Sequence, residues 1–303
     1  MSTPETEFRA GDDATAPAAA TTAGTGTAPM ASVTTAGGGG RRVRDTDGGT
    51  ARVGFLGETL IVFRRQLRLA LRNPAWVLIG LAQPILYLAL FGPLLKPLAP
   101  ALGTTNAYTL FVPGLLLQLG LFGAFFAGFG LLGEWRDGVI EAERVTPASR
   151  VALLLGRVLR DVLQLFVQGV LLIVLALAFG LDGSPGGMLL GLLMVMLVGT
   201  SCAAFSYALA LTTKSEDAMA PILNIVSMPV LLLSGILLPM TLGPTWLRVI
   251  SDVLPTKHVV DGVRAVFVGN FDSSQTVWGL FWAVLLAVAG VVLGARVFRR
   301  QNA

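Results

Sequence analysis

Six long apolar runs follow one another along the chain from residue 75 onward. A membrane-spanning helix needs about 20 apolar residues, and each run reaches roughly that length. The runs are continuous and not alternations of about ten residues, so they predict helices and not the strands of a closed barrel. The predicted spans are residues 75–95, 107–132, 162–180, 187–211, 218–238 and 276–295.

A different pattern occupies residues 54–74, just before the first span. Large apolar residues recur at helical spacing at Leu56, Leu60, Phe63, Leu67 and Leu71, with Arg64, Arg65, Arg68 and Arg72 on the other side. This pattern predicts a basic amphipathic helix in the membrane interface. Pro74 would end the helix and let the chain turn into the bilayer. A soluble helix is the alternative, and the adjoining span favours the interface.

Residues 1–53 are rich in Ala, Thr and Gly and contain almost no large apolar residue. Such a segment buries too little surface to offset its chain entropy, so we expect a disordered tail. No apolar stretch follows a basic start, so we expect no cleaved signal peptide.

The composition of the whole chain supports a membrane protein, with residues 75–300 as its transmembrane domain. Only 13% of the 303 residues are charged and 54% are hydrophobic, whereas soluble domains contain about 25% charged residues. The single cysteine and single histidine exclude a disulfide framework and a Cys/His metal cluster. We therefore expect an all-α polytopic membrane protein that has no metal site and does not bind nucleic acid.

Basic residues are distributed unequally between the two sides of the predicted spans. Thirteen lie on one side: Arg64, Arg65, Arg68, Arg72, Arg136, Arg144, Arg150, Arg157, Arg160, Lys214, Arg296, Arg299 and Arg300. Four lie on the other: Lys96, Arg248, Lys257 and Arg264. Because cytoplasmic loops are enriched in Lys and Arg, both termini are predicted to be cytoplasmic, in a multi-pass protein of the cell membrane.

The charged segment 133–160 between the second and third spans is a candidate docking element. Its helical spacing predicts a short amphipathic helix from Glu134 to Arg144, with Trp135 on its apolar face. Thr146 and Pro147 then predict the cap and first residue of the next helix. The candidate docking residues are Glu134, Trp135, Arg136, Asp137, Gly138, Glu141 and Arg144. The alternative is an ordinary solvated loop.

Three spans contain residues that could line a substrate pathway. In the second span, Gly120, Ala124 and Gly128 follow the small-xxx-small spacing that lets another helix approach closely. The third span carries a polar stripe at Arg157, Asp161, Gln164 and Gln168, which could bond helices together or face a cavity. The pathway candidates are Phe122, Phe126, Phe129, Gln164, Asn224, Ser227 and Met228. Packing against lipid or other helices is the alternative for the aromatic residues.

Residues 241–275, between the last two spans, are too apolar for an ordinary external loop. Each apolar stretch within them is too short to cross the membrane. They predict interfacial or re-entrant helices, since Asp261 and Arg264 interrupt the apolar residues. A pair of surface helices without a gating role is the alternative.

Two groups of residues carry a resemblance to a known family. The first is Glu134, Gly138, Glu141, Arg144, Thr146-Pro147, Arg150 and Gly156-Arg157; the second is Ser234-Gly235, Pro239, Pro244, Trp246, Pro255, Asp261 and Arg264. Over residues 55–300 the chain resembles ABC-2-type transport permeases, and within them the bacterial drug-resistance permeases similar to the daunorubicin exporter's membrane subunit. Leu254 departs from the pattern, because a polar residue is expected before Pro255.

The resemblance implies a subunit with six transmembrane helices, an amphipathic connecting helix at 54–74 and a coupling helix in segment 133–160. It implies that a separate ABC ATPase binds ATP and Mg, that a second copy or a related permease completes the membrane unit, and that Phe126 and Asn224 bound a central cavity. Re-entrant helices near Ser234, Gly235, Pro239, Trp246, Pro255, Asp261 and Arg264 would close the outer exit.

These observations favour one function over the alternatives. The chain contains no G-x-x-x-x-G-K-[ST], HExxH or GxSxG motif, so we expect a transport subunit and not an enzyme. Apolar, uncharged spans favour ATP-driven efflux of a hydrophobic or amphipathic molecule, such as an antibiotic or a lipid. Export of a polysaccharide stays open. An ion-gradient-driven transporter usually needs charges deep in its spans, and a membrane scaffold without transport is compatible with everything except the family resemblance.

Overall fold

The structure is a computed structural model that describes residues 54–72, 75–100, 104, 106–144, 149–237, 240 and 243–301. The predicted tail, residues 1–53, lies outside the described residues, as do Thr146, Pro147 and Pro239. Within the described part the chain is helical and contains no strand, which confirms the predicted all-α class.

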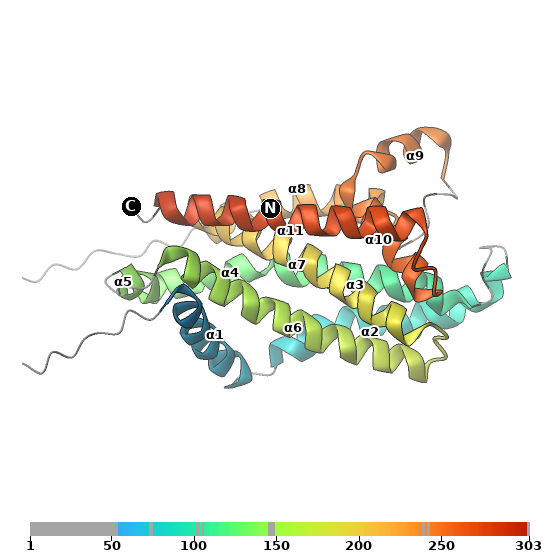
Figure 1. Ribbon diagram of the computed structural model, residues 1–303, viewed down its shortest axis with the longest axis horizontal. Helices are drawn as coiled ribbons and strands as arrows, with labels where there is room; N and C mark the ends of the chain where they lie inside the picture. Colours follow the sequence, from blue (N-terminus) through green and yellow to red (C-terminus); the bar gives the residue numbers. More distant parts are fainter. Residues whose placement is uncertain are drawn as a thin grey trace, which may run out of the picture. The chain divides into compact units, whose positions relative to one another are not determined.

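The described helices follow the order shown in Figure 1. They are α1 (Phe55–Arg72), α2 (Ala75–Leu95), the 3-10 turn η1 (Lys96–Leu98), α3 (Ala107–Phe125), α4 (Ala127–Arg136), α5 (Val139–Arg144), α6 (Arg150–Ala178), α7 (Pro185–Thr213), α8 (Glu216–Leu233), α9 (Thr245–Asp252), α10 (Pro255–Phe267) and α11 (Ser274–Gln301).

Six of the described segments are long and apolar enough to cross a membrane, as predicted. They are Val77–Leu95, Ala107–Arg136, Arg150–Ala178, Pro185–Thr213, Glu216–Leu233 and Ser274–Arg300. Helix α6 begins twelve residues before the predicted third span, so the charges of Arg157 and Asp161 lie within a spanning helix. Their partners, described below, explain why the helix can contain them.

The second span is broken into α3 and α4 at Phe126. A break frees backbone groups that lipid cannot satisfy, so a neighbour must bond to them. Ser206 of α7 does so: its hydroxyl donates to the Phe125 carbonyl and accepts from the Gly128 N–H at 3.0 Å. One serine thus stabilises a bend inside the membrane span.

Helix α7 is the central element of the bundle. It packs against α3, α4, α6, α8, α10 and α11. The predicted close approach along Gly120, Ala124 and Gly128 is confirmed, with α7 as the partner: an added Cβ on Gly128 would lie 2.6 Å from the Ser206 carbonyl oxygen. On the α11 side, an added Cβ on Gly290 would lie 2.6 Å from the Ser201 Cα.

Two details of segment 133–160 differ from prediction. The expected single helix from Glu134 to Arg144 is divided at Gly138, which has a φ of +72° and separates α4 from α5. The cap of α6 is Ser149, not Thr146: its side chain accepts from the Ala152 N–H at 3.2 Å. A left-handed glycine stops a helix readily, and the local charge pattern did not show that.

Candidate functional site

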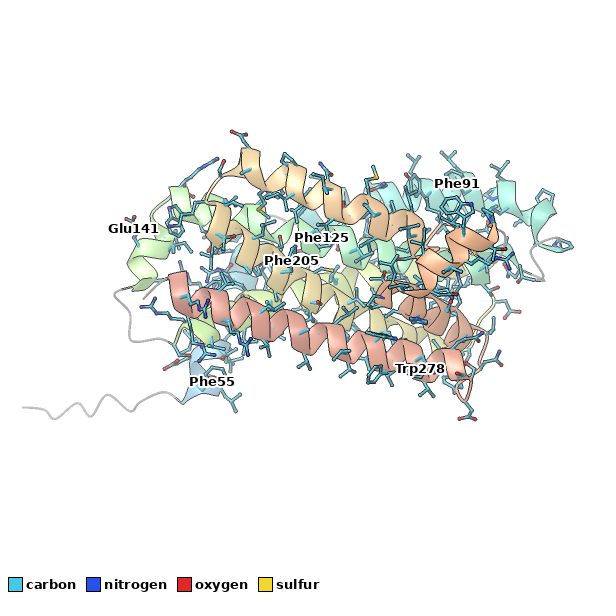
Figure 2. All side chains as sticks on the ribbon, turned by 90° about the horizontal axis from the view of Figure 1, so that it is seen from above. Phe55, Phe91, Phe125, Glu141, Phe205 and Trp278 are labelled. Carbon is cyan, nitrogen blue, oxygen red and sulfur yellow. The ribbon has the colours of Figure 1, made fainter. Side chains whose placement is uncertain are left out.

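Functional candidates lie at the two opposite ends of the long helices. Figure 2 shows Phe55 and Glu141 at one end and Phe91 and Trp278 at the other. We call the first the α1–α5 end, because it carries α1, α5 and the turn between α7 and α8. We call the second the α9–α10 end.

Arg157 of α6 is the centre of the α1–α5 end. It is 1% exposed, and its guanidinium pairs with Glu134 of α4 at 2.7 Å and with Glu143 of α5 at 2.8 Å. A buried guanidinium needs such partners, because an unpaired charge in a low-dielectric interior is very costly. The pairing joins three helices at one residue.

Helix α1 is tied into the same cluster. Arg65 donates to Glu143 at 3.0 Å, and Gln66 donates to Glu134 at 3.0 Å. At the start of α6, the Ser149 N–H donates to Glu58 at 2.8 Å. Each of these bonds links α1 to residues at least 68 positions further along the chain, so α1 is fixed to the bundle by polar contacts.

The predicted docking residues divide between the inside and the outside of this end. Glu134 is paired inward, and Trp135 is half-buried, with the Lys214 ammonium 5.0 Å from its ring. Arg136, Asp137 and Glu141 are exposed. A partner could reach these three side chains without breaking the inner cluster.

The remaining docking candidates lie next to these residues. Gly138 is half-buried at the division between α4 and α5. The backbone of Arg144 ends α5, but its side chain lies outside the described residues. Arg136 also pairs with Glu216 at 3.1 Å, which connects α4 to the start of α8.

The polar stripe of α6 serves mainly to bond helices together. Besides Arg157, Asp161 accepts from the buried Tyr207 hydroxyl of α7 and pairs with Arg160 at 2.5 Å. Gln168 donates to the Val77 carbonyl of α2 at 3.2 Å. Gln164 is half-buried, and its role as a pathway residue stays a prediction.

An aromatic ladder follows the break between α3 and α4. The rings of Phe122 and Phe126 are 6.5 Å apart, and those of Phe126 and Phe129 are 5.8 Å apart. Phe126 is 55% exposed. Phe125 is buried and packs against Phe205 of α7, and the two lie close together in Figure 2. At the break, Phe125 therefore contacts α7, whereas the neighbouring Phe126 is exposed.

The pathway candidates of α8 differ in their exposure. Asn224 and Met228 are exposed, whereas Ser227 is 5% exposed. Like the ladder, Asn224 and Met228 lie on a surface of this chain and not in an internal cavity.

Arg264 of α10 organises the α9–α10 end. Its guanidinium donates to the Leu110 carbonyl at 3.2 Å, to Gly235 at 2.7 Å and to Ile236 at 3.3 Å. Burial lowers its pKa to about 10, against the opposing effect of Asp261, so it stays charged at neutral pH. Arg264 joins α10 to α3 and to the turn that follows α8.

Three hydroxyl groups secure the same turn. Ser234 and Thr256 are hydrogen-bonded to each other, and Ser251 donates to the Leu233 carbonyl at 2.6 Å. Gly235 has a φ of +71°, which a glycine adopts without strain. Both glycine and serine of the predicted Ser-Gly pair therefore have a structural role.

Helix α10 is buried in the bundle, whereas α9 lies at the surface with Ser251 as its buried residue. Val259, Val260, Val263 and Phe267 of α10 are fully buried, and α10 packs against α3, α7 and α11. Of the other predicted gate residues, Trp246 of α9 is 63% exposed, while Pro255 and Asp261 are half-buried. Their function as an outer gate stays a prediction.

Sequence reasoning missed the residues that complete these contacts. Four residues were not among the candidates: Glu143, Gln66, Tyr207 and Ser206. The first three bond to charged side chains, and Ser206 bonds to the backbone at the break between α3 and α4. The sequence contained one signal for such a contact. Gln66 is an uncharged polar residue among the arginines of α1, and it is buried against the bundle. No group of three or more His, Cys, Asp or Glu in the described part could hold a metal ion.

Comparisons with known proteins match most of the described chain. The profile of the family described as ABC-2 type transporter matches residues 57–268. The transport permease ycf38 of Pyropia yezoensis is 27% identical over 217 residues, which are 70% of this chain and 74% of the relative. That of Cyanophora paradoxa is 23% identical over 217 residues, 70% of this chain and 75% of the relative.

A more distant relative carries the name multidrug ABC transporter permease YbhR, from Escherichia coli strain K12. It is 22% identical over 194 residues, which are 63% of this chain and 52% of the relative.

Proposed function

Because this chain belongs to the ABC-2 type transporter family, as a membrane permease subunit that is not itself an ATPase, we propose that it exports a hydrophobic or amphipathic molecule. Drugs, antibiotics and lipids are the cargo classes proposed. Permeases of this family act with ABC ATPase subunits, and ATP and Mg belong to that partner.

The aromatic ladder at the broken second span carries this proposal. Phe122, Phe126 and Phe129 place three rings in a row, and the middle ring is largely exposed. The charges that α6 carries into its span, Arg157 and Asp161, are paired with other side chains of the bundle and do not belong to the ladder. Flat apolar surfaces without charge suit an apolar cargo, because binding is then driven by removal of apolar area from water.

The ladder also lies at the break between α3 and α4, where the angle between the two helices could change during transport. Ser206 satisfies the backbone groups of the break through two hydrogen bonds. A helix that is already interrupted can change its angle at the interruption at lower cost than a continuous helix, because fewer helical hydrogen bonds resist the change. Cargo contact at Phe126 would thus be coupled to the position of α4.

Docking of the ATPase is proposed at the exposed residues of the α1–α5 end, Arg136, Asp137 and Glu141, with Gly138 and Arg144 beside them. The excess of basic residues on this side supports a cytoplasmic location for it and for both termini. Asn224 and Met228 of α8, on the exposed surface, are proposed to face a second permease copy or a related permease across the pathway.

The name of the relative YbhR favours drug efflux within the family, which agrees with the resemblance to drug-resistance permeases. A polysaccharide is the alternative cargo. It has no specific structural observation in its favour.

Replacement of Phe126 tests the cargo class. We expect Phe126→Ala to weaken binding of daunorubicin and rhodamine 6G to the protein in nanodiscs by at least about tenfold, since burying one aromatic ring contributes on the order of 1.5–3 kcal/mol. Fluorescence polarisation of the two dyes measures the affinity. Phe281→Ala is the matched control, because Phe281 is 51% exposed on another span, α11. Equal affinities of the two variants would contradict the proposal.

A further inference from the structure

Helix α1 packs against the bundle with one narrow face. Val62 and Gln66 are its buried residues, and Val62 contacts α6 where Gly156 leaves room: an added Cβ on Gly156 would lie 2.6 Å from Val62 Cγ1. Apart from the polar contacts of Glu58 and Arg65, the opposite surface of the helix is exposed. The composition of that surface determines what can bind there.

A leucine stripe forms the first part of this surface. Leu56, Leu60 and Leu71 are 82%, 45% and 72% exposed, and Phe63 and Leu67 lie beside them at helical spacing. Contiguous exposed apolar side chains are unfavourable in water and mark a surface that contacts a membrane or a protein.

A basic stripe lies directly next to the leucines. Arg64, Arg68 and Arg72 follow one another at i, i+4 spacing and are all exposed. In the described part of the chain none of the three makes an ion pair, whereas the fourth arginine, Arg65, pairs with Glu143. The acidic residue of α1, Glu58, is bonded to the Ser149 N–H on the packed side. Three positive charges are therefore available to an anionic ligand.

The position of α1 places both stripes at the depth of lipid headgroups. Helix α1 ends at Arg72, and α2, which contains the first span, begins at Ala75. One of the contacts of α1 with α6 is at Gly156, six residues before the uncharged run that starts at Val162. At about 1.5 Å per residue that is about 9 Å along α6 from the uncharged run, next to the outer edge of a headgroup layer that is about 5–8 Å thick. Figure 1 shows α1 at an angle to α6 and not as an extension of α2.

We propose that Arg64, Arg68 and Arg72 bind the headgroups of anionic phospholipids, while the leucine stripe inserts beside their acyl chains. A helix with adjoining basic and apolar faces at this depth matches the physical requirements of an interfacial lipid-binding helix. An acidic surface of the ATPase is less suited to this position, because it would leave the leucines in water. Arg65 and Gln66, on the same helix, connect this lipid contact to the Arg157 cluster.

Lipid-selective quenching tests the assignment in the full-length chain. Leu60→Cys, in a Cys202→Ala background, carries a bimane label in nanodiscs of phosphatidylcholine with phosphatidylglycerol. Bromine is placed either on the phosphatidylglycerol or on an equal amount of phosphatidylcholine. We expect brominated phosphatidylglycerol to quench several-fold more, since each arginine at an anionic surface contributes on the order of fivefold enrichment. Raising the salt concentration should reduce the difference.

Variants separate lipid from protein as the occupant. The triple variant Arg64→Gln, Arg68→Gln, Arg72→Gln should lose the excess quenching, and the matched triple lysine variant, which keeps the charge, should retain most of it. Both should co-purify with the ATPase as the wild type does. Equal quenching by the two brominated lipids, an excess that survives in the glutamine variant, or loss of ATPase without a change in quenching would overturn the proposal.

Discussion

The two ends of the helices are held by different kinds of contact. At the α1–α5 end, side-chain ion pairs centred on Arg157 join α1, α4, α5 and α6. At the α9–α10 end, Lys257 pairs with Asp252 and Asp261 near the surface, but the buried contacts bring backbone against backbone. An added Cβ on Gly187 would overlap the Val266 carbonyl oxygen, and one on Gly279 would lie 2.8 Å from the Gly262 Cα. The charge of Arg264 there is bound by carbonyls, not by carboxylates.

This difference has a mechanical consequence. An ion pair between side chains can be exchanged for another when a charged partner approaches, and long side chains adjust without moving the backbone. Glycine contacts allow no such exchange, because any shift of one backbone displaces the other. The α1–α5 end is thus suited to respond to a partner, and the α9–α10 end to move as one unit.

Removing the central charge should have the largest effect on stability. Arg157→Met would leave the half-buried Glu134 and the buried Glu143 without their shared cation, although Arg65 still pairs with Glu143; breaking such a buried pair costs about 3–5 kcal/mol. That corresponds to a fall of roughly 6–20 °C in the melting temperature, measurable by differential scanning fluorimetry in detergent.

A compensated variant makes this test specific. Adding Glu134→Gln and Glu143→Gln to Arg157→Met removes the two carboxylate charges that Arg157 had balanced and should restore much of the lost stability. If the triple variant melts as low as Arg157→Met alone, lost packing and not charge explains the effect, and the contrast between the two ends is wrong.

Gly187→Ala should have the next largest effect, at the α9–α10 end. The added methyl group meets the Val266 carbonyl oxygen, so α7 and α10 must separate, at a cost of about 1–3 kcal/mol. Its neighbour Gly186 is the matched control, because a Cβ there would lie an ordinary 3.6 Å from the Phe271 ring.

The same melting experiment compares these neighbours. Gly186→Ala should be neutral or slightly stabilising, by about 0.5–1 kcal/mol, because alanine is the better helix former. Equal melting temperatures for the two variants would show that the contact between α7 and α10 can relax.

The sequence was sufficient for the features that depend on local pattern. Continuous apolar runs predicted the six spans, and the arginine and leucine spacing predicted α1. The spacing of Gly120, Ala124 and Gly128 predicted a close helix contact, which the structure confirms with α7. Each of these depends on residues within a few turns of one another.

The features that were missed depend on partners distant in sequence. Nothing near Glu134 indicates that Arg157 and Gln66 will meet it, so a buried ion pair was interpreted as an exposed docking charge. The break at Phe126 is stabilised by Ser206, 80 positions later in the chain. Whether a charge is inside or outside follows from tertiary packing, which periodicity does not encode.

A substitution in the exposed part of the α1–α5 end should have the smallest effect on stability and a specific effect on association with the ATPase. Glu141→Lys changes a side chain outside the Arg157 cluster, so the free energy of unfolding should change by less than about 0.5 kcal/mol. Co-purification with the cognate ABC ATPase should nevertheless fall about five- to tenfold, because a reversed charge at an interface repels its former partner.

Asp272→Lys is the control for that measurement. It reverses an equally exposed carboxylate at the α9–α10 end, where the family's ATPase is not expected to reach, and it should leave co-purification unchanged. If both reversals weaken co-purification equally, net charge and not docking at α5 determines the association. If Glu141→Lys instead lowers the melting temperature as Arg157→Met does, the division of this end into an inner cluster and an outer docking surface is wrong.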